Sequence, residues 1–180
     1  MKEYWFNFEW VPILSEETKQ YSFPDPISRF FKSQYSGPAV YRWTVSESDK
    51  LQMVYYGEAE DLARRVDGYR RGHEGQKTNA RIKALFSSLG GHLTIGLDRL
   101  RFESFLLNGI EINERSLSKK DVRCFLENVL IVTSPSDVQL LNKATSLDYK
   151  QAEKVKKALT NLSDANRREV ISRVLLRAEK

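Results

Sequence analysis

The sequence predicts an α/β fold of the α+β kind, with helices flanking a small, mostly antiparallel central sheet. Two strand-like runs over residues 39–45 and 51–56 are joined by the polar turn Ser-Glu-Ser-Asp-Lys, which is typical of a β-hairpin. The segments that follow carry apolar residues at helical spacing, interrupted by glycine-rich breaks. A chain of 180 residues suits one such domain with small appendages.

An aromatic arm is expected before this core. Aromatic residues occupy alternate positions near the start of the chain: Tyr4, Phe6, Phe8 and Trp10. This alternation predicts a strand that ends at Pro12. Residues 23–31 then predict a short helix that begins near Pro26. Because so much apolar surface does not stay exposed, we expect the arm to pack against the main domain.

Two helices are expected after the hairpin. The first spans about residues 59–71 and follows Gly57, which permits a tight turn from strand to helix. The second starts near Asn79 with Thr78 as its cap, and it stops at the glycine pair 90–91.

The remaining chain predicts further strands and three more helices. Strands are expected between Leu93 and Leu107, and the following Asn-Gly pair at 108–109 is a strong hairpin signal. A helix over about residues 119–132 has Ser118 in the capping position. Two helices at the C-terminus, about residues 148–159 and 164–178, are typical of a helical hairpin.

The sequence argues against membrane and disulfide-rich classes. Its longest uninterrupted aliphatic run covers residues 129–132, far short of the roughly 20 residues that span a bilayer. The N-terminal stretch has no long apolar run, so no signal peptide is expected. Cys124 is the only cysteine, which excludes a disulfide within the chain and a multi-cysteine zinc site. We expect a cytoplasmic protein without a membrane partner.

Positive charge is concentrated in one short stretch. The whole chain carries a net charge of +5, with a sequence pI near 9.3. Between Leu62 and Lys83 alone, seven basic residues stand against two acidic ones, which gives the same net charge. Such a concentration favours a phosphate backbone as partner, because binding releases condensed counterions. The alternative interpretation is an ordinary solvated face.

The helix after the hairpin can be oriented by its periodicity. Five residues fall within one apolar arc at about 100° per residue: Ala59, Leu62, Ala63, Val66 and Tyr69. Arg65 lies on the border of this arc, whereas Arg64 points away from it. Of the two arginines, only Arg65 is therefore expected to reach the sheet edge where Tyr41 and Tyr55 emerge from their strands.

In their order and spacing, these residues resemble the GIY-YIG nuclease family. The matching positions are Ala39-Val40-Tyr41, Tyr55-Tyr56-Gly57, Leu62 and Arg65. The family also has a glutamate on a later helix and an asparagine beyond it, and here Glu127 and Asn142 stand at those places. The resemblance covers about residues 37–145, between an N-terminal arm (1–36) and a C-terminal helical hairpin (146–180).

The resemblance implies a DNA endonuclease of a restriction, defence or repair type that hydrolyses phosphodiester bonds with a divalent metal. Tyr41 would position or deprotonate the attacking water, and Tyr55 would hydrogen-bond the water or the phosphate. Arg65 offers a planar fork to phosphate oxygens. Glu127 would be the protein ligand of one Mg²⁺ or Mn²⁺ ion per active site, which retains most of its waters.

The sequence departs from the family pattern in three places. Ala39 and Val40 replace Gly-Ile, and Tyr56 stands where the family has isoleucine. Tyr69 lies four residues after Arg65, where several members carry histidine. A tyrosine hydroxyl can bond a phosphate or water there, but it is not a base at neutral pH.

Six further residues are candidates for binding DNA. They are Arg70, Arg71, Asn79, Arg81, Lys83 and Asn142. Arginine and lysine would contact the phosphate backbone, and Asn79 would do so through its side chain or through the N-terminus of its helix. A cutter of both strands with one such site must dimerise or act twice, so a homodimer is one prediction.

Less specific interpretations remain open beside these. Tyr41 and Tyr55 are also ordinary strand formers. Glu127 can form an ion pair with Arg123 one helical turn earlier. Asn142 can cap a helix or turn. As a whole, the chain can be a non-catalytic nucleic-acid-binding module or partner subunit that retains the fold.

Overall fold

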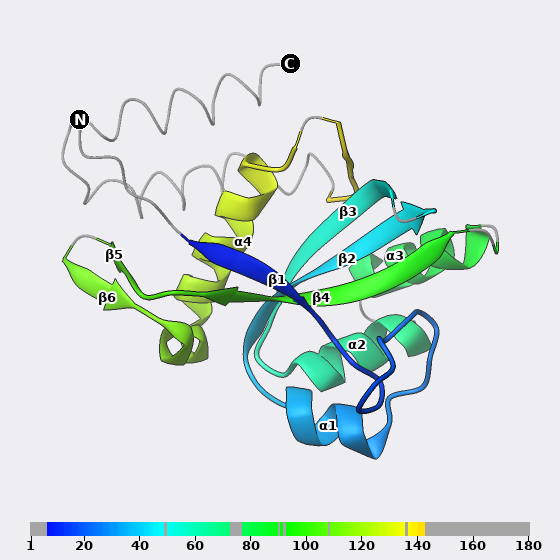
Figure 1. Ribbon diagram of the computed structural model, residues 1–180, viewed down its shortest axis with the longest axis horizontal. Coiled ribbons are helices and arrows are strands. Elements are labelled where there is room, and N and C mark those ends of the chain that lie inside the picture. The colour runs from blue at the N-terminus through cyan, green and yellow to red at the C-terminus, as the bar shows by residue number, and fades with distance from the viewer. Residues whose placement is uncertain are drawn as a thin grey trace.

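The computed structural model describes residues 7–48, 50–72, 77–89, 91, 93–107, 109–135 and 137–142 (Figure 1). It has an α+β fold with a five-stranded sheet, a small separate hairpin and four α-helices within these ranges. The predicted strand positions Tyr4 and Phe6, and the predicted helices over 148–159 and 164–178, lie outside the described residues.

The central sheet is mixed but mostly antiparallel, as the sequence predicts. Its strands are β1 (Phe8–Pro12), β2 (Ala39–Glu47), β3 (Lys50–Ala59), β4 (Thr94–Phe102) and β7 (Gln139–Leu140). They lie in the order β1-β4-β2-β3-β7. Every neighbouring pair is antiparallel except β3 and β7, which are parallel.

The β2–β3 hairpin is tighter than the polar turn suggested. Glu47 pairs with Lys50, so the connection has two residues rather than about five, and both strands extend beyond their predicted ends. Polar residues can continue a ladder because its hydrogen bonds come from the backbone, while their side chains face water. The register shifts between Val45 and Ser46, where a bulge accommodates the irregularity.

Gly57 does not form the predicted turn from strand to helix. It lies inside β3, opposite Tyr41 of β2, and the strand continues to Ala59. A Cβ atom at position 57 would lie 2.4 Å from the Tyr41 hydroxyl oxygen and 2.5 Å from its Cζ. Glycine is therefore needed because the Tyr41 ring crosses directly over the backbone of the neighbouring strand.

The helices begin where side chains cap them. They are α1 (Arg29–Tyr35), α2 (Leu62–Arg71), α3 (Lys77–Ser88) and α4 (Lys120–Val132). α1 starts later than the predicted Pro26 because the Ser28 hydroxyl accepts the Phe31 N–H. α2 likewise starts after Asp61, whose carboxylate accepts the Arg64 N–H.

Two predicted caps are wrong. Thr78 lies inside α3, which begins at Lys77. Ser118 closes the preceding short 3₁₀ helix η1 (Glu114–Ser118), and its hydroxyl donates to the Arg115 carbonyl. α4 therefore has Lys119 as its N-cap, with no hydrogen bond from that side chain.

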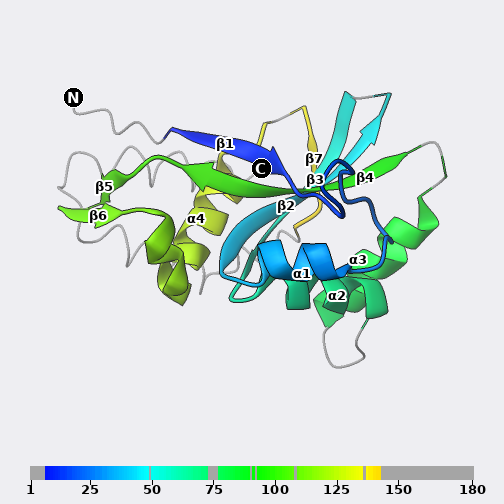
Figure 2. The same ribbon diagram turned by 60° about the horizontal axis from the view of Figure 1, so that its bottom comes forward.

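The two faces of the sheet have separate cores. Tyr41 and Trp43 of β2 point toward α1, α2 and α3, which gather on one side of the sheet (Figures 1 and 2). Val40 of β2 and Tyr56 of β3 point to the opposite face, which α4 covers. Adjacent residues of one strand thus serve different cores, as the alternation of strand side chains requires.

The remaining elements follow the prediction closely. β5 (Phe105–Leu107) and β6 (Ile110–Ile112) form the predicted hairpin, and Gly109 has φ +77° at its turn. The N-terminal arm packs on the core as expected, since β1 pairs with β4 and Phe31 is fully buried. Within the described ranges, no helix combines the length and apolar character that a membrane span requires.

Candidate active site

Three tyrosine hydroxyls meet at one point between the sheet and α2. Tyr41 comes from β2, Tyr55 from β3 and Tyr69 from α2. The hydroxyl oxygens of Tyr41 and Tyr69 are 2.9 Å apart, and Tyr69 donates to the Tyr55 hydroxyl at 3.3 Å. Tyr41 and Tyr69 are fully buried, and Tyr55 is 6% exposed. Residues chosen from three separate segments of the sequence thus form one hydrogen-bonded cluster.

Arg65 leans over this cluster from α2. Its Nε donates to the Tyr41 hydroxyl at 3.3 Å, and its guanidinium carbon lies 5.0 Å from the centre of the Tyr69 ring. The Asp61 cap fixes where the helix begins, and therefore which residues face the sheet. Arg64 is exposed, whereas Arg65 is partly buried. The orientation predicted from helical periodicity is confirmed for both arginines.

Burial keeps the tyrosine hydroxyls protonated. The pKa of Tyr41 is raised well above its usual value near 10 by burial and then by Tyr55, while Arg65 opposes the shift. Burial also raises the pKa of Tyr55 and of Tyr69, with a further contribution from the neighbouring tyrosine in each case. At neutral pH the three side chains are therefore hydrogen-bond donors and acceptors, but not bases.

Glu127 approaches the cluster from the other face of the sheet. It lies on α4, and its charge acts on Tyr55 while Arg65 acts on Glu127 in turn. Burial raises the pKa of Glu127 to about 7, with a second contribution from Glu58. β7 pairs with β3 only at Met53 and Val54. The candidate site lies on the part of β3 beyond this pairing. The tyrosines are on one face of the sheet there, and the carboxylates are on the other.

An ion pair between Glu58 and Arg123 was not predicted. The Nε of Arg123 lies 2.8 Å from a carboxylate oxygen of Glu58, and Arg123 is only 4% exposed. Arg123 thus pairs with Glu58, instead of the alternative partner Glu127 on its own helix. The sequence held one usable signal: Glu58 directly follows Gly57, so its side chain faces α4 whereas Gly57 faces Tyr41.

Asn142 holds the backbone of β3. Its side-chain oxygen accepts the Tyr56 N–H at 2.9 Å, and its side-chain nitrogen donates to the Tyr56 carbonyl at 3.0 Å. The carboxamide thereby takes the place of a partner strand beyond the short β7 pairing. Asn142 is neither a helix cap nor turned away from the site: it fixes the peptide next to Tyr55. Contact with DNA stays a prediction for this residue.

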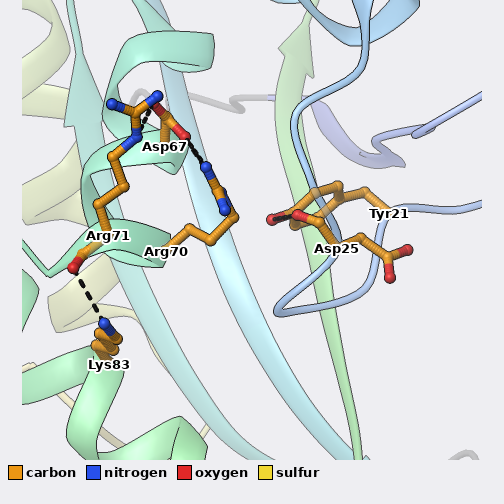
Figure 3. A network of polar contacts seen from close by, with 6 residues as sticks. All are labelled: Tyr21, Asp25, Asp67, Arg70, Arg71 and Lys83. Carbon is orange, nitrogen blue, oxygen red and sulfur yellow. Dashed lines mark hydrogen bonds and ion pairs between the residues drawn. The ribbon is translucent and has the colours of Figure 1, made fainter.

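Three of the predicted DNA-binding residues belong to one polar network (Figure 3). Arg70 and Arg71 both bind the carboxylate of Asp67, with nearest N–O distances of 2.9 Å and 2.8 Å. Lys83 of α3 donates to the Arg71 carbonyl at 3.0 Å, at the C-terminal end of α2. One carboxylate shared by two guanidiniums leaves this corner of the molecule positively charged.

The other two candidates on α3 have structural partners. Arg81 donates from Nη1 to the Leu141 carbonyl at 3.1 Å, which ties α3 to the segment that carries Asn142. Asn79 is 1% exposed and packs against Gly68, where an added Cβ would lie 2.9 Å from its Nδ2. A side chain so deeply buried cannot reach a phosphate. The structure therefore argues against a phosphate contact through the Asn79 side chain, whereas a contact at the N-terminus of α3 stays a prediction.

Metal ligands are sparse around this site. Among the residues that the structure describes, no group of three or more His, Cys, Asp and Glu side chains is arranged to hold a metal ion. Glu127 and Glu58 are the two carboxylates whose charges act on one another here, and Glu127 also acts on Tyr55. Comparison with known proteins gives no match to any family model, curated protein or solved structure.

Proposed function

We propose that this chain is a metal-dependent DNA endonuclease of the GIY-YIG type, which hydrolyses phosphodiester bonds. One observation carries the proposal: the hydroxyls of Tyr41, Tyr55 and Tyr69 meet beside Arg65, with Glu127 within electrostatic reach. These five residues come from β2, β3, α2 and α4, and four of them, Tyr41, Tyr55, Arg65 and Glu127, stand at positions of that family's motif. Their convergence gives the resemblance a physical basis that isolated motifs do not.

In this proposal Arg65 binds the phosphate. Its Nε donates to Tyr41, which orients the guanidinium, and the planar fork would donate to non-bridging oxygens of the scissile phosphate. Charge that develops on those oxygens in the transition state is stabilised by a cation fixed in advance over the Tyr69 ring. Lysine cannot reproduce this geometry, because its ammonium is a point charge.

The tyrosines orient the reacting groups. Because burial raises the pKa of Tyr41, its hydroxyl stays protonated, and positioning the water is the role that remains for it. Tyr55 is the most exposed of the three and would hydrogen-bond the water or the phosphate. Tyr69 stands where several members of that family carry histidine, and its hydroxyl links the other two.

The carboxylates suit a divalent metal ion with few protein ligands. Mg²⁺ keeps most of its waters and is commonly held by only one or two carboxylates. The pKa of Glu127 is raised to about 7 by burial and by Glu58, so the ionised carboxylate is costly here and a bound cation would offset that cost. Glu127 would hold Mg²⁺ or Mn²⁺. When bound, such an ion supplies a Lewis acid and a water of lowered pKa.

A second candidate is a non-catalytic nucleic-acid-binding module with the same fold. The complete burial of Tyr41 and Tyr69 favours this alternative, because their hydroxyls already satisfy one another. A cluster of this kind can serve packing alone, while the positive corner around Arg71 and Lys83 binds DNA.

Nicking of supercoiled plasmid distinguishes the two candidates. We expect the pure protein to relax plasmid in Mg²⁺ or Mn²⁺, and chelation by EDTA to stop it. Glu127→Gln should bind DNA as the wild type does without cutting it, because only the charge that holds the ion is lost. Cleavage that persists in Glu127→Gln would indicate a contaminant or a different centre. DNA binding without cleavage in either protein would support the non-catalytic module.

A further inference from the structure

Arg123 joins three segments of the chain in one place. Its Nε donates to Glu58 of β3 at 2.8 Å, and its Nη1 donates to the Leu117 and Ser118 carbonyls at 2.8 Å and 3.2 Å. Leu117 and Ser118 form the end of η1, directly before α4. A single buried guanidinium thus ties the start of α4 to the end of β3.

Glu58 and Arg123 are adjacent to the residues of the candidate site along both elements. Glu58 follows Gly57, which accommodates the Tyr41 ring, and lies three residues after Tyr55. Arg123 lies four residues before Glu127 on α4, so both side chains leave the same face of the helix. The charge of Glu58 also contributes to the raised pKa of the Glu127 carboxyl.

Stability alone does not explain such a pair. Removing two charges from water costs about as much as their attraction returns, so buried ion pairs contribute little net stability. Their best-attested use is to fix one arrangement among several that are similar in packing. Here α4 packs through the apolar residues Leu126 and Leu130, whose contacts tolerate sliding more readily than a directional guanidinium does.

We propose that Glu58 and Arg123 are a positioning pair, which sets α4 against β3 so that the Glu127 carboxylate lies beside Tyr55 and Arg65 where a divalent cation binds. This inference rests on the proposed function. Neither residue needs to contact the substrate. They act through the position of α4. Without the pair, α4 would be shifted and Glu127 would lie at a different point along the edge of β3.

The test uses single variants of the full chain with a matched control. Glu58→Gln keeps the shape of the side chain and removes its charge. Arg123→Lys keeps the charge and removes the fork that reaches Leu117 and Ser118. Arg42→Lys is the control, because Arg42 and Asp98 form a similar partly buried ion pair with an N–O distance of 2.7 Å between β2 and β4.

Two readouts separate positioning from general destabilisation. The first is paramagnetic broadening of the Tyr55 and Arg65 NMR signals by Mn²⁺, which needs no DNA and should vanish in Glu127→Gln. The second is kcat and KM for plasmid nicking, well below the unfolding temperature of every variant. Glu58→Gln and Arg123→Lys should each raise the Mn²⁺ requirement and lower kcat by about 10- to 100-fold, with KM for DNA unchanged. Arg42→Lys should change neither readout, even where it lowers the unfolding temperature.

The results distinguish failure of the positioning pair from failure of the proposed nuclease activity. Glu58→Gln that behaves like the wild type, or no worse than Arg42→Lys, overturns the positioning pair and leaves the nuclease intact. A wild type that binds Mn²⁺ beside Tyr55 but cuts no DNA overturns the nuclease, and the Mn²⁺ readout of the variants still judges the pair. A wild type without Mn²⁺ binding at this site overturns both. Should Glu58→Gln fail to fold, Glu58→Asp retains the charge, shifts the carboxylate by one methylene and is judged by the same comparison.

Discussion

At the scale of single residues, the two neighbouring arginines of α2 differ by orientation alone. Arg65 donates to Tyr41 over the Tyr69 ring, whereas Arg64 is exposed. Arg65→Lys should lower kcat for nicking by about 10²- to 10³-fold, because a point charge loses the planar fork at the phosphate. Arg64→Lys is the matched control and should be nearly silent. Equal losses at both positions would mean that neither guanidinium binds the scissile phosphate.

Glu127 predicts an unusual pH dependence of stability for the metal-free protein. Its pKa is about 7 in the folded chain against 4.5 for the ordinary side chain, so folding favours the protonated form. The unfolded chain loses its proton first as pH rises, and stability should therefore fall by about 1–3 kcal/mol between pH 4.5 and 7. Denaturant unfolding across this range measures the fall.

Two comparisons test whether Glu127 causes this fall in stability with pH. Glu127→Gln should remove the fall, while the exposed carboxylate variant Glu111→Gln should retain it. Saturating Mn²⁺ should also flatten the wild-type profile, since a cation that binds the ionised carboxylate stabilises the folded state. A wild-type profile as flat as that of Glu127→Gln would show that this carboxylate is well solvated.

At the scale of elements, the β2–β3 pair depends on one missing side chain. Gly57→Ala would bring a Cβ atom within 2.4 Å of the Tyr41 hydroxyl oxygen, and neither the ring nor the strand can move without disturbing the other. We expect a loss of about 1–3 kcal/mol in the free energy of unfolding, as for an overpacked core. Gly37→Ala is the control, because no atom lies within 4 Å of the added Cβ. Similar unfolding midpoints for both variants would place the Tyr41 ring elsewhere.

At the scale of the whole molecule, the positive corner where the C-terminal end of α2 meets α3 is the expected path of DNA. Arg71→Ala and Lys83→Ala should each reduce the slope of log affinity against log salt by about one unit, without changing which sequences bind. Binding is measured in the Glu127→Gln background, so that cleavage does not interfere. Arg115→Ala, which replaces an exposed arginine of η1 outside this corner, should leave the slope unchanged. A slope that does not respond to Arg71 or Lys83 would mean that this corner is only solvated.

Sequence patterns predicted those features of the fold that depend on residues close together in the sequence. Helical periodicity separated Arg65 from Arg64, and the Asn-Gly pair before Ile110 located a hairpin, because each depends on neighbours in sequence. The role of Gly57 was misread, since the Tyr41 ring that requires it lies on another strand. The burial of Asn79 could not be predicted, because nothing local indicates the close approach of Gly68.

In the candidate site, too, local spacing predicts some residues, whereas contacts between distant segments could not be predicted. Tyr41, Tyr55 and Arg65 could be chosen from spacing along a hairpin and one helix. The Glu58–Arg123 pair joins residues 65 positions apart and depends on how α4 settles on the sheet, which a single sequence does not record. Asn142 was found as a candidate, but its two bonds to the Tyr56 peptide give it a role that its sequence position did not suggest.

The three tyrosine hydroxyls also have a direction. Each hydroxyl owns a single proton, and Arg65 donates to Tyr41 while Tyr69 donates to Tyr55. Since Tyr69 gives its proton to Tyr55, the proton between Tyr41 and Tyr69 comes from Tyr41. The hydrogen bonds therefore run in one direction, from the guanidinium of Arg65 through Tyr41 and Tyr69 to Tyr55. In the proposed function, the proton of Tyr55 at the end of this chain of hydrogen bonds would be donated to the water or to the phosphate. The chain of hydrogen bonds thus begins at the Arg65 cation and ends at Tyr55, the least buried of the three tyrosines, and a cation at one end polarises the hydroxyls along it.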